Sequence, residues 1–570
     1  MAAALAVAPQ MVRGDSCGHD FDFHLVSWID VLASWRHGII YPHWAISSNY
    51  NAGEPRFVFY PPLTWMMGAA LGALLPWSWV PAALTFLLLA GSGWATRALA
   101  RTVIDDAAAT LAGCIAIFSG YTLYTVYERA AFAELAGGVW IPLLLLLVLR
   151  DRGSAPAWRR TIGGSAVGLS LVVAGAWLSN APVGVMACYL LAGFAAVVAA
   201  MRRSWVPVLR AAVGAVIGLG LAAFYLVPAA VEQRWVDIRQ ATEDPGELIQ
   251  NSFLFVHPAD PQLALHDAEL GRVSWIAVLM LVVILVAIVV GWHRRILPGG
   301  RSVWVPLALI PAVVLLLMLP ISLPVWDALP KMRFLQFPWR WLVVLEAPLG
   351  IFAASAIWVP GRARRNAIVA GCAVVFCGLS LFAGRVFFQV CDPYDAVPGM
   401  LQEYRDGNGF QGTDEYEPAG ADNSLVAQNL PAGCLVADPA RTLGVTTADD
   451  PQPEWEVDQK SCEAAMPDPA MIDARRWSVR GELPRDGFLV LRLRRYPAWD
   501  VRVNGRSVRD LGDREDGLMV VPVSAGQVEV DANWLATPDA RRGRWISIAA
   551  LALVVGLGLT GRRRTGIQLK

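Results

Sequence analysis

Residues 273–292 read VSWIAVLMLVVILVAIVVGW, a continuous apolar run without a charged side chain. A helix of about 20 such residues is long enough to cross the hydrocarbon core of a bilayer. The sequence therefore predicts a polytopic α-helical membrane protein with about 11–13 spans. Further runs that reach or approach this length lie near 82–100, 107–125, 137–149, 162–180, 183–201, 208–230, 303–320, 339–358, 366–387 and 544–561.

The overall composition supports the same class of protein. Only 16 % of the 570 residues are charged and 56 % are hydrophobic, so polar side chains are too few to cover the surface of a soluble enzyme. The apolar content also excludes a disordered chain. The 47 basic residues are balanced by 47 acidic residues, so the chain lacks the basic excess that is typical of nucleic-acid-binding proteins. A nucleic-acid-binding protein is therefore excluded. Membrane lipids, and no nucleic acid, are therefore expected as partners.

Arginine residues between the apolar runs predict which loops lie in the cytoplasm, because basic loops are retained there. Alternating from these loops, we expect five segments on the outer side of the membrane: 13–60, 126–136, 231–272, 321–338 and 388–543. The basic clusters are Arg97 and Arg101, Arg150 to Arg160, Arg202 to Arg210, Arg294 to Arg301, Arg362 to Arg365 and Arg562 to Arg564.

Two shorter apolar stretches need a separate interpretation. Residues 61–76 would break the alternation if they crossed the membrane, so we expect an interfacial or re-entrant helix between Pro61 and Pro76. Residues 1–12 are too short to cross, and we interpret them as the outer part of a first span that begins upstream. A cleaved signal peptide is disfavoured because no basic segment precedes the apolar run.

The composition changes near residue 388, where the chain becomes polar and loses its long apolar runs. From about 476, apolar and polar residues alternate in FLVLRLRRY, WDVRVNG, LMVVPV and QVEVDANW, which predicts strands, and Asn504–Gly505 predicts a hairpin turn. We expect a small β-sandwich-like domain there. The predicted domains are a transmembrane domain at 1–387 with its first outer loop at 13–60, an extracytoplasmic domain at 388–543, and a C-terminal transmembrane helix with a basic tail at 544–570.

The cysteines divide by location. Cys17, Cys391, Cys434 and Cys462 lie in segments expected outside, where disulfides persist, and Cys434 with Cys462 is the preferred pair because both belong to one irregular segment. No CxxC spacing occurs, so a zinc ribbon is excluded. The cysteines expected within spans, where they act as small apolar residues, are Cys114, Cys188, Cys372 and Cys377.

The first outer loop concentrates ionisable groups next to the membrane. His19, Asp20, Asp22 and His24 lie within six residues, in GHDFDFH. In an extended segment Asp20, Asp22 and His24 would share one face, where they suit general-base catalysis or the binding of a divalent cation. The alternative is a hydrated loop whose acids only cap a following helix over 24–37.

Two other stretches place charges at the membrane edge. Glu54 and Arg56 flank Pro55 in an aromatic loop, and an interfacial anchor does not explain their charges. Glu128, Arg129 and Glu134 stand in VYERAAFAEL. Glu128 and Arg129 can neutralise each other, whereas Glu134 has no local partner and favours a functional role.

A third group of charges is cationic and lies in an expected outer segment, against the positive-inside rule. Lys331, Arg333 and Arg340 lie there. Cations at this position suit the binding of a lipid phosphate, which arginine holds in a bidentate manner. Snorkelling of long side chains is the alternative, and Glu346 is a candidate partner for Arg340 within the span. Nucleotide binding through GxxxxGK[ST] or GxGxxG, and zinc binding through HExxH, are excluded because these motifs are absent.

Taken in order, these motifs resemble known membrane proteins. The acidic first outer loop, the YPPL segment, the arginine–glutamate pair and the outer tail resemble the GT-C superfamily of membrane glycosyltransferases. GHDFDFH, NYNAGEPRFVFYPPL, ERAAFAELAG, FLQFPWR and GTDEYEP are similar to a bacterial family labelled 6-pyruvoyl-tetrahydropterin synthase-related, membrane domain. The tail YPAWDVRVNGRSV is similar to that of YfhO-like membrane proteins.

The superfamily resemblance implies a polyprenyl-phosphate-linked sugar as donor and an active site that faces outward. It also implies an acid in the first outer loop that activates the acceptor hydroxyl, which matches Asp20 or Asp22 by position, and a second acid at Glu128 or Glu134. The chain departs from the superfamily pattern at its first span, which is shortened to a dozen residues.

We therefore expect a glycosyltransferase in the bacterial cytoplasmic membrane that transfers sugar to an extracytoplasmic glycan, lipid or protein. The alternatives are a non-enzymatic transporter or export component for lipid or polysaccharide, and a scaffold whose β domain binds glycan. A transporter typically has inverted repeats or broken helices, and the sequence indicates neither. The charges instead gather at one outer face, which favours the enzyme. A divalent cation is the one candidate cofactor. The candidate catalytic residues are Asp20, Asp22, Glu128 and Glu134, and the candidate substrate-binding residues are His19, His24, Glu54, Arg56, Arg129, Lys331, Arg333 and Arg340.

Overall fold

The structure is a computed structural model of residues 1–570. The arginine cluster from Arg150 to Arg160 and the end of the basic tail fall largely outside the residues it describes. The described residues are all except 151–163, 244, 259, 359–360, 441–442, 444–454, 456–461, 467–470, 510 and 564–570.

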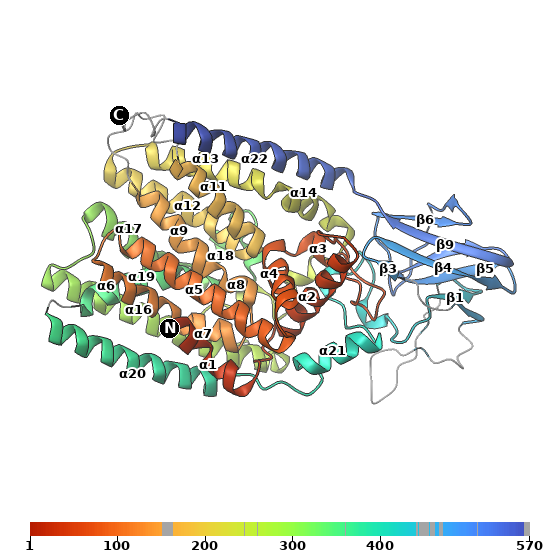
Figure 1. The fold of residues 1–570 in the computed structure, drawn as a ribbon, viewed down its shortest axis with the longest axis horizontal. Coiled ribbons are helices and arrows are strands. Elements are labelled where there is room, and N and C mark those ends of the chain that lie inside the picture. The colour runs from red at the N-terminus through yellow and green to blue at the C-terminus, as the bar shows by residue number, and fades with distance from the viewer. Residues whose placement is uncertain are drawn as a thin grey trace.

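A helical part and a small β domain make up the described structure, and helix α22 (Pro538–Arg563) runs from the β domain along the helical part (Figure 1). The helices in the first half are α1 (Ala2–Arg13), α2 (Phe21–Arg36), α3 (Arg56–Phe59), α4 (Pro62–Leu74), α5 (Val80–Ala100), α6 (Asp106–Ile117), α7 (Gly120–Tyr127), α8 (Phe132–Leu135), α9 (Gly137–Leu149), α11 (Gly164–Ser179), α12 (Ala181–Arg202), α13 (Val206–Leu221), α14 (Ala223–Glu232) and α15 (Gln240–Glu243). The later helices are α16 (Ala264–Arg294), α17 (Arg301–Leu317), α18 (Leu323–Ala328), α19 (Leu342–Ile357), α20 (Arg362–Val386), α21 (Val397–Asp406) and α22 (Pro538–Arg563).

Seven helices of the described chain are long and apolar enough to cross a membrane, and up to ten if each of three bent helix pairs forms one span. This is fewer than the expected 11–13, because three apolar runs are bent and because α4 and the described part of the run at 162–180 are shorter than 18 residues. The runs at 107–125, 208–230 and 303–320 belong to the pairs α6–α7, α13–α14 and α17–α18, bent by 42°, 74° and 91°. At the first bend Ser119 begins a new helix, since its hydroxyl accepts a hydrogen bond from the Thr122 amide.

The two shorter apolar stretches are both helical. The stretch 61–76 contains α4, which has 13 residues and begins after Pro61. A side chain at Gly68 of α4 would collide with the Trp28 ring of α2, so this glycine permits the two helices to pack closely. Residues 1–12 form most of α1, which packs against α20 through the hydrogen bond from Ser380 Oγ to Leu5 O (2.7 Å). An interfacial or re-entrant position for α4 stays a prediction.

Two disulfides join the segments expected outside. The predicted bond between Cys434 and Cys462 is confirmed. A second bond joins Cys17 to Cys391, which ties the segment after α1 to the segment after α20. This pair was not predicted because the two cysteines are 374 residues apart in sequence.

The β domain consists of two antiparallel sheets with strand orders β2-β1-β5-β8 and β3-β4-β9-β6-β7. Side chains from both sheets, such as Leu489 and Val530, belong to one buried cluster. Asn504 and Gly505 form the β6–β7 turn with φ of 48° and 77°, as their sequence predicts. Strands begin earlier than the alternation from about 476 indicated: β1 (Gly433–Val436), β2 (Ala464–Met466), β3 (Met471–Asp473), β4 (Arg476–Leu483), β5 (Gly487–Arg494), β6 (Trp499–Val503), β7 (Arg506–Ser507), β8 (Leu518–Val523) and β9 (Gly526–Trp534).

An aromatic cluster docks the β domain onto the first outer loop. Trp44 of this loop is fully buried, and its ring centroid lies 5.4 Å from that of Trp499 and 5.6 Å from that of Trp534. Gly53, with φ of 75°, runs so close to Trp44 that a side chain there would collide with the indole. At the end of α14 the Glu232 carboxylate accepts hydrogen bonds from Tyr496 and Thr537, both at 2.5 Å. The β domain is therefore held by ring packing and by hydrogen bonds, and the two kinds of contact meet at Tyr496.

We expect Trp44→Ala to loosen this docking, because truncating a buried aromatic side chain in a packed core costs about 3–5 kcal/mol. Hydrogen exchange measured by mass spectrometry should then be faster in β6 and β9 than in the wild-type protein. Trp79→Ala is the matched control, since the Trp79 side chain is 53 % exposed. Equal exchange in the two variants would contradict the docking role of Trp44.

Candidate functional site

A cavity of about 640 Å³ lies between the helical part and the segment that precedes the β domain; we call it the main cavity. It brings together residues from all of the expected outer segments. Its charged lining residues are His19, Asp20, Arg129, Glu134, Glu247, Glu269, Lys331, Arg340 and Glu415. Six of the twelve candidate residues therefore meet at one place.

Asp20 is held at the start of α2 and not in an extended strand. The apolar period of Leu25, Trp28 and Leu32 extends back to Phe21, so the helix begins directly after Asp20. The Asp20 amide donates a 2.9 Å hydrogen bond to the Arg129 carbonyl. A side chain at Gly18 would collide with the backbone of residues 128–129, so only glycine permits this approach. The expectation that Asp20, Asp22 and His24 share one face of an extended segment is wrong.

The three residues point to different surroundings. Asp20 lines the main cavity, with its side chain 37 % exposed. Asp22 lines a neighbouring cavity. His24 is fully buried among Phe23, Tyr60 and Phe132, where burial lowers its pKa to about 4.

The three proposed metal ligands are thus not assembled. Within the part of the chain that the structure describes, no group of three or more His, Cys, Asp or Glu side chains is placed to hold a metal ion. Both ring nitrogens of His24 also lack a hydrogen-bond partner among the described residues. The candidate metal site at Asp20, Asp22 and His24 is therefore contradicted by the geometry.

Glu134 is the centre of a buried charge network at the floor of the main cavity. Its Oε2 lies 2.6 Å from Arg129 Nη1 and 3.4 Å from Arg340 Nε, and its Oε1 accepts a hydrogen bond from the Tyr121 hydroxyl. The side chain is 2 % exposed. The expectation that Glu134 has no local partner is wrong, because Arg129, five residues earlier, pairs with it, and Arg340 is brought to it from a distant segment. Arg340 pairs with Glu134 and not with Glu346, which accepts a hydrogen bond from Thr122.

Arg129 connects this network to Asp20. Its Nη2 lies 3.7 Å from Asp20 Oδ2, while Glu134 occupies the other end of the guanidinium. Burial lowers the pKa of Arg129, but Glu134 and then Asp20 raise it well above its ordinary value. Arg129 is therefore a permanent cation beside a partly exposed carboxylate. It does not neutralise Glu128, which pairs with Arg272 at 2.8 Å.

Helix α16 contributes two partners that the sequence analysis missed. Glu269 lies 2.7 Å from His19 Nε2, and Arg272, one turn later, holds Glu128. The hydrogen bond to Glu269 is the main reason that the pKa of His19 is raised. Burial raises the pKa of Glu128, although Arg272 opposes this. The stretch HDAELGR at 266–272 could have indicated these partners, because its charged residues directly precede the apolar run 273–292.

The structure separates the cations expected to bind phosphate. Lys331 lines the main cavity and has no carboxylate partner among the described residues, with its Nζ 3.5 Å from Gln233 Oε1. Arg333 instead pairs with Asp327 at 2.7 Å, where both side chains are about half exposed (49 % and 48 %). Lys331 and Arg340 therefore remain as candidates within the main cavity.

One arm of the main cavity is apolar. It is formed by α11, α12, α13 and α14 around the 74° bend of the α13–α14 pair. Leu219 on this arm is 37 % exposed. The cavity thus joins a charged end to an apolar end. The lining residues of the apolar arm are Trp177, Pro182, Val185, Leu219, Tyr225 and Leu226.

A second cavity of about 520 Å³, which we call the side cavity, shares Phe23, Thr413 and Glu415 with the main cavity. Six of its seven charged lining residues are acidic, and burial raises the pKa of Glu415 to about 7. The acidic lining residues are Asp22, Glu247, Asp395, Glu403, Asp414 and Glu415, and Arg56 is its basic residue.

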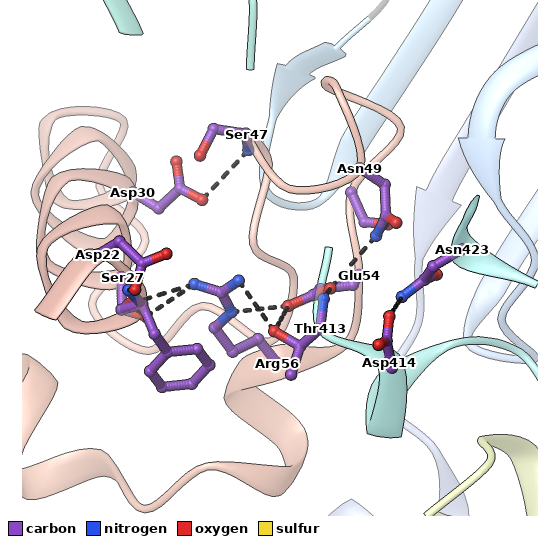
Figure 2. A network of polar contacts seen from close by, with 12 residues as sticks. Asp22, Ser27, Asp30, Ser47, Asn49, Glu54, Arg56, Thr413, Asp414 and Asn423 are labelled. Atoms are coloured by element: carbon purple, nitrogen blue, oxygen red, sulfur yellow. Dashed lines mark hydrogen bonds and ion pairs between the residues drawn. The ribbon is translucent and has the colours of Figure 1, made fainter. Parts of the chain in front are cut away.

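Glu54 and Arg56 form a buried pair that fastens the first outer loop to the segment before the β domain (Figure 2). Their side chains are 2.7 Å apart and at most 3 % exposed. Glu54 accepts hydrogen bonds from the amide and hydroxyl of Thr413, and Arg56 donates to Ser27 and Thr413. These contacts satisfy both charges within the protein, so the geometry favours a structural role over substrate binding.

Comparison with known proteins assigns the chain to a family. A family model described as a 6-pyruvoyl-tetrahydropterin synthase related domain, a membrane protein, matches residues 57–389. The match covers more than half of the chain, including Arg129, Glu134, Lys331 and Arg340, and begins after His19 and Asp20. No curated protein and no solved structure matches the chain.

Removal of a buried charge of this network should cost more stability than removal of a solvated charge. We expect Glu134→Ala to destabilise the protein by about 3–5 kcal/mol, because it removes the nearest buried countercharge of Arg129 and Arg340. Arg333→Ala should cost less than about 1 kcal/mol, since its pair with Asp327 is solvated. Thermal unfolding of the two variants in detergent, followed by circular dichroism, compares these costs. Equal stability of the two variants would show that Glu134 does not organise the site.

Proposed function

The chain belongs to the 6-pyruvoyl-tetrahydropterin synthase-related family of membrane proteins, and on this premise we propose that it is a glycosyltransferase using a polyprenyl-phosphate-linked sugar. The acceptor is a glycan, lipid or protein of the cell envelope. The observation that carries the proposal is a partly exposed carboxylate, Asp20, that shares one cavity with Arg129, Arg340 and Lys331 and with an apolar arm.

Each end of the main cavity suits one part of such a donor. The apolar arm around Leu219 suits a prenyl chain, since its lining is apolar and Leu219 is partly exposed at the surface of the helical part. The cations suit the phosphate, because arginine and lysine form charge-assisted hydrogen bonds with phosphate oxygens. The sugar between them would lie next to Asp20.

In this proposal Asp20 is the general base. It takes the proton from the acceptor hydroxyl as the acceptor oxygen bonds to the anomeric carbon. The bond from that carbon to the phosphate oxygen breaks, and Lys331, Arg340 and Arg129 stabilise the charge that develops on the leaving phosphate. Glu134 and Glu128 are not assigned to the base, because each is almost fully buried and lies within 2.8 Å of an arginine, whereas Asp20 is 37 % exposed and 3.7 Å from Arg129.

The side cavity provides a route for the acceptor. It shares the lining residues Thr413 and Glu415 with the main cavity, and its acidic residues disfavour an anionic acceptor. We interpret the two sheets of the β domain as a small sandwich. We further propose that the cavities face the outside of a bacterial cytoplasmic membrane, since the arginine clusters lie in the opposite loops.

Transport of the lipid-linked sugar without cleavage is the second candidate. The three bent helix pairs favour it, because broken helices are typical of transporters. The distinguishing experiment uses purified protein in proteoliposomes with radiolabelled polyprenyl-phosphate sugars. Transfer requires release of polyprenyl phosphate together with labelled acceptor, whereas transport moves the intact donor between leaflets.

We expect Asp20→Asn to reduce sugar transfer about 10²–10⁴-fold with little change in donor binding, because loss of a general base affects the chemical step. Asp22→Asn is the matched control, since Asp22 lies two residues away but lines the side cavity. Initial rates with saturating donor compare the variants. Full activity in Asp20→Asn would remove Asp20 from the mechanism.

Lys331→Ala should raise the KM for the lipid donor about 10–100-fold, as expected for the loss of one hydrogen bond to a charged group. Arg333→Ala is the control, because Arg333 lies on the same loop but pairs with Asp327 outside the main cavity. Donor titrations at fixed acceptor give both values. An equal rise in the two variants would point to a general effect of positive charge and not to a phosphate site.

A further inference from the structure

A histidine and a carboxylate meet at the main cavity through residues that are far apart in sequence. His19 Nε2 lies 2.7 Å from Glu269 Oε1. The His19 side chain is 55 % exposed, whereas that of Glu269 is 13 % exposed and belongs to the long helix α16. The exposed ring is thus held by a carboxylate on a rigid element. Neither residue has a role in the transfer step described above.

The pair resembles the arrangement in which a carboxylate orients a catalytic imidazole. A carboxylate bound to one ring nitrogen selects the tautomer that leaves the other nitrogen able to accept a proton, and it stabilises the imidazolium that then forms. Here Glu269 binds Nε2, so Nδ1 is the accepting atom. Asp20 is the next residue in the chain, and both side chains line the main cavity.

From this geometry we infer that His19, oriented by Glu269, carries the acceptor's proton from Asp20 to the water outside the cavity. The inference rests on the proposed glycosyl transfer. His19 acts as a proton relay, and Glu269 is a positioning residue. Each transfer leaves Asp20 protonated, and the relay speeds its return to the carboxylate with which the next transfer begins.

The proton moves from the acceptor to water through Asp20 and His19. During transfer the acceptor O–H bond breaks, the new carbon–oxygen bond forms, and the phosphate leaves with the electron pair of the old bond. The proton passes first to the Asp20 carboxylate and then to Nδ1 of neutral His19. Arg129, 3.7 Å from Asp20, favours the return of Asp20 to its charged form. The exposed imidazolium then releases the proton to water, and no other reactant is needed.

Groups from three sides set the charge of His19. Glu269 of α16 raises its pKa most, burial lowers it, Arg129 after α7 lowers it, and Asp20 raises it. Glu128 also faces this region but is paired with Arg272. The relay starts from neutral His19, so activity should fall as the pH drops below the pKa of His19. Removal of the Glu269 charge lowers this pKa, which moves the acidic limb of the pH profile to lower pH.

The test compares Glu269→Gln with Asp267→Asn across a pH series of initial rates. Asp267 is a matched control because it holds His257 at the same distance of 2.7 Å on the same helix, with both side chains more exposed. For Glu269→Gln we expect kcat about 10-fold lower and the acidic limb shifted by about one pH unit to lower pH, with the donor KM unchanged. Asp267→Asn should match the wild type.

Nuclear magnetic resonance of imidazole-labelled protein gives a readout that needs no activity. The chain has seven histidines, and His19→Gln assigns the resonance of His19. The pKa of His19 should fall in Glu269→Gln and stay unchanged in Asp267→Asn. Should Glu269→Gln fail to fold, Glu269→Asp serves instead, since it keeps the charge but shortens the reach and should give a smaller shift of the same sign.

The outcomes separate the relay from the proposed function. An unchanged pKa of His19 and an unchanged acidic limb in Glu269→Gln would overturn the relay, even if the wild-type protein transfers sugar. If Glu269→Gln lowers the pKa of His19 but the wild-type protein transfers no sugar from any donor, the His19–Glu269 pair is supported and the proposed transfer is overturned. A fall in kcat without a shift of the acidic limb would reduce Glu269 to a structural residue and overturn the relay.

Discussion

The buried carboxylate of Glu134 is the contact on which the candidate site depends. It compensates two arginines, Arg129 and Arg340, that arrive from segments separated by several spans. Burial of a charge next to an apolar bundle is unfavourable unless the charge is paired, so the three side chains require one another. Through Arg129 the same network reaches Asp20. The loop before α2, the segment after α7 and the start of α19 are thereby held together.

The first outer loop is fastened on its other side by a different kind of contact. Trp44 packs among the aromatic rings of the β domain, and the Glu54–Arg56 pair binds the Thr413 segment. These contacts place Asp20 between two fixed partners, the helical part and the β domain. Two cavities remain between them, one with cations and an apolar arm and one with an acidic lining. The proposed donor and acceptor routes follow from this difference in charge.

Several features were predictable from local sequence because their causes are local. The apolar runs predict helices that cross a membrane, alternation predicts the later strands, and Asn504–Gly505 predicts a hairpin turn that the structure confirms. The Cys434–Cys462 bond was also predictable, since both cysteines lie in one segment. The number of spans was less certain because Ser119 and similar breaks bend a helix without interrupting its apolar composition.

Local sequence is sufficient to show that this is a membrane protein of a known family and that ionisable residues collect in the segments expected outside. The tertiary structure alone decided which of these residues meet. Glu269 and Arg340 lie on helices far from His19 and Glu134, and no local pattern records such pairings. Likewise, the helix that begins at Phe21 separated Asp20, Asp22 and His24, which a strand would have kept together. A pairing of charges depends on where folding brings two segments together, and sequence spacing contains this information only within one helix or strand.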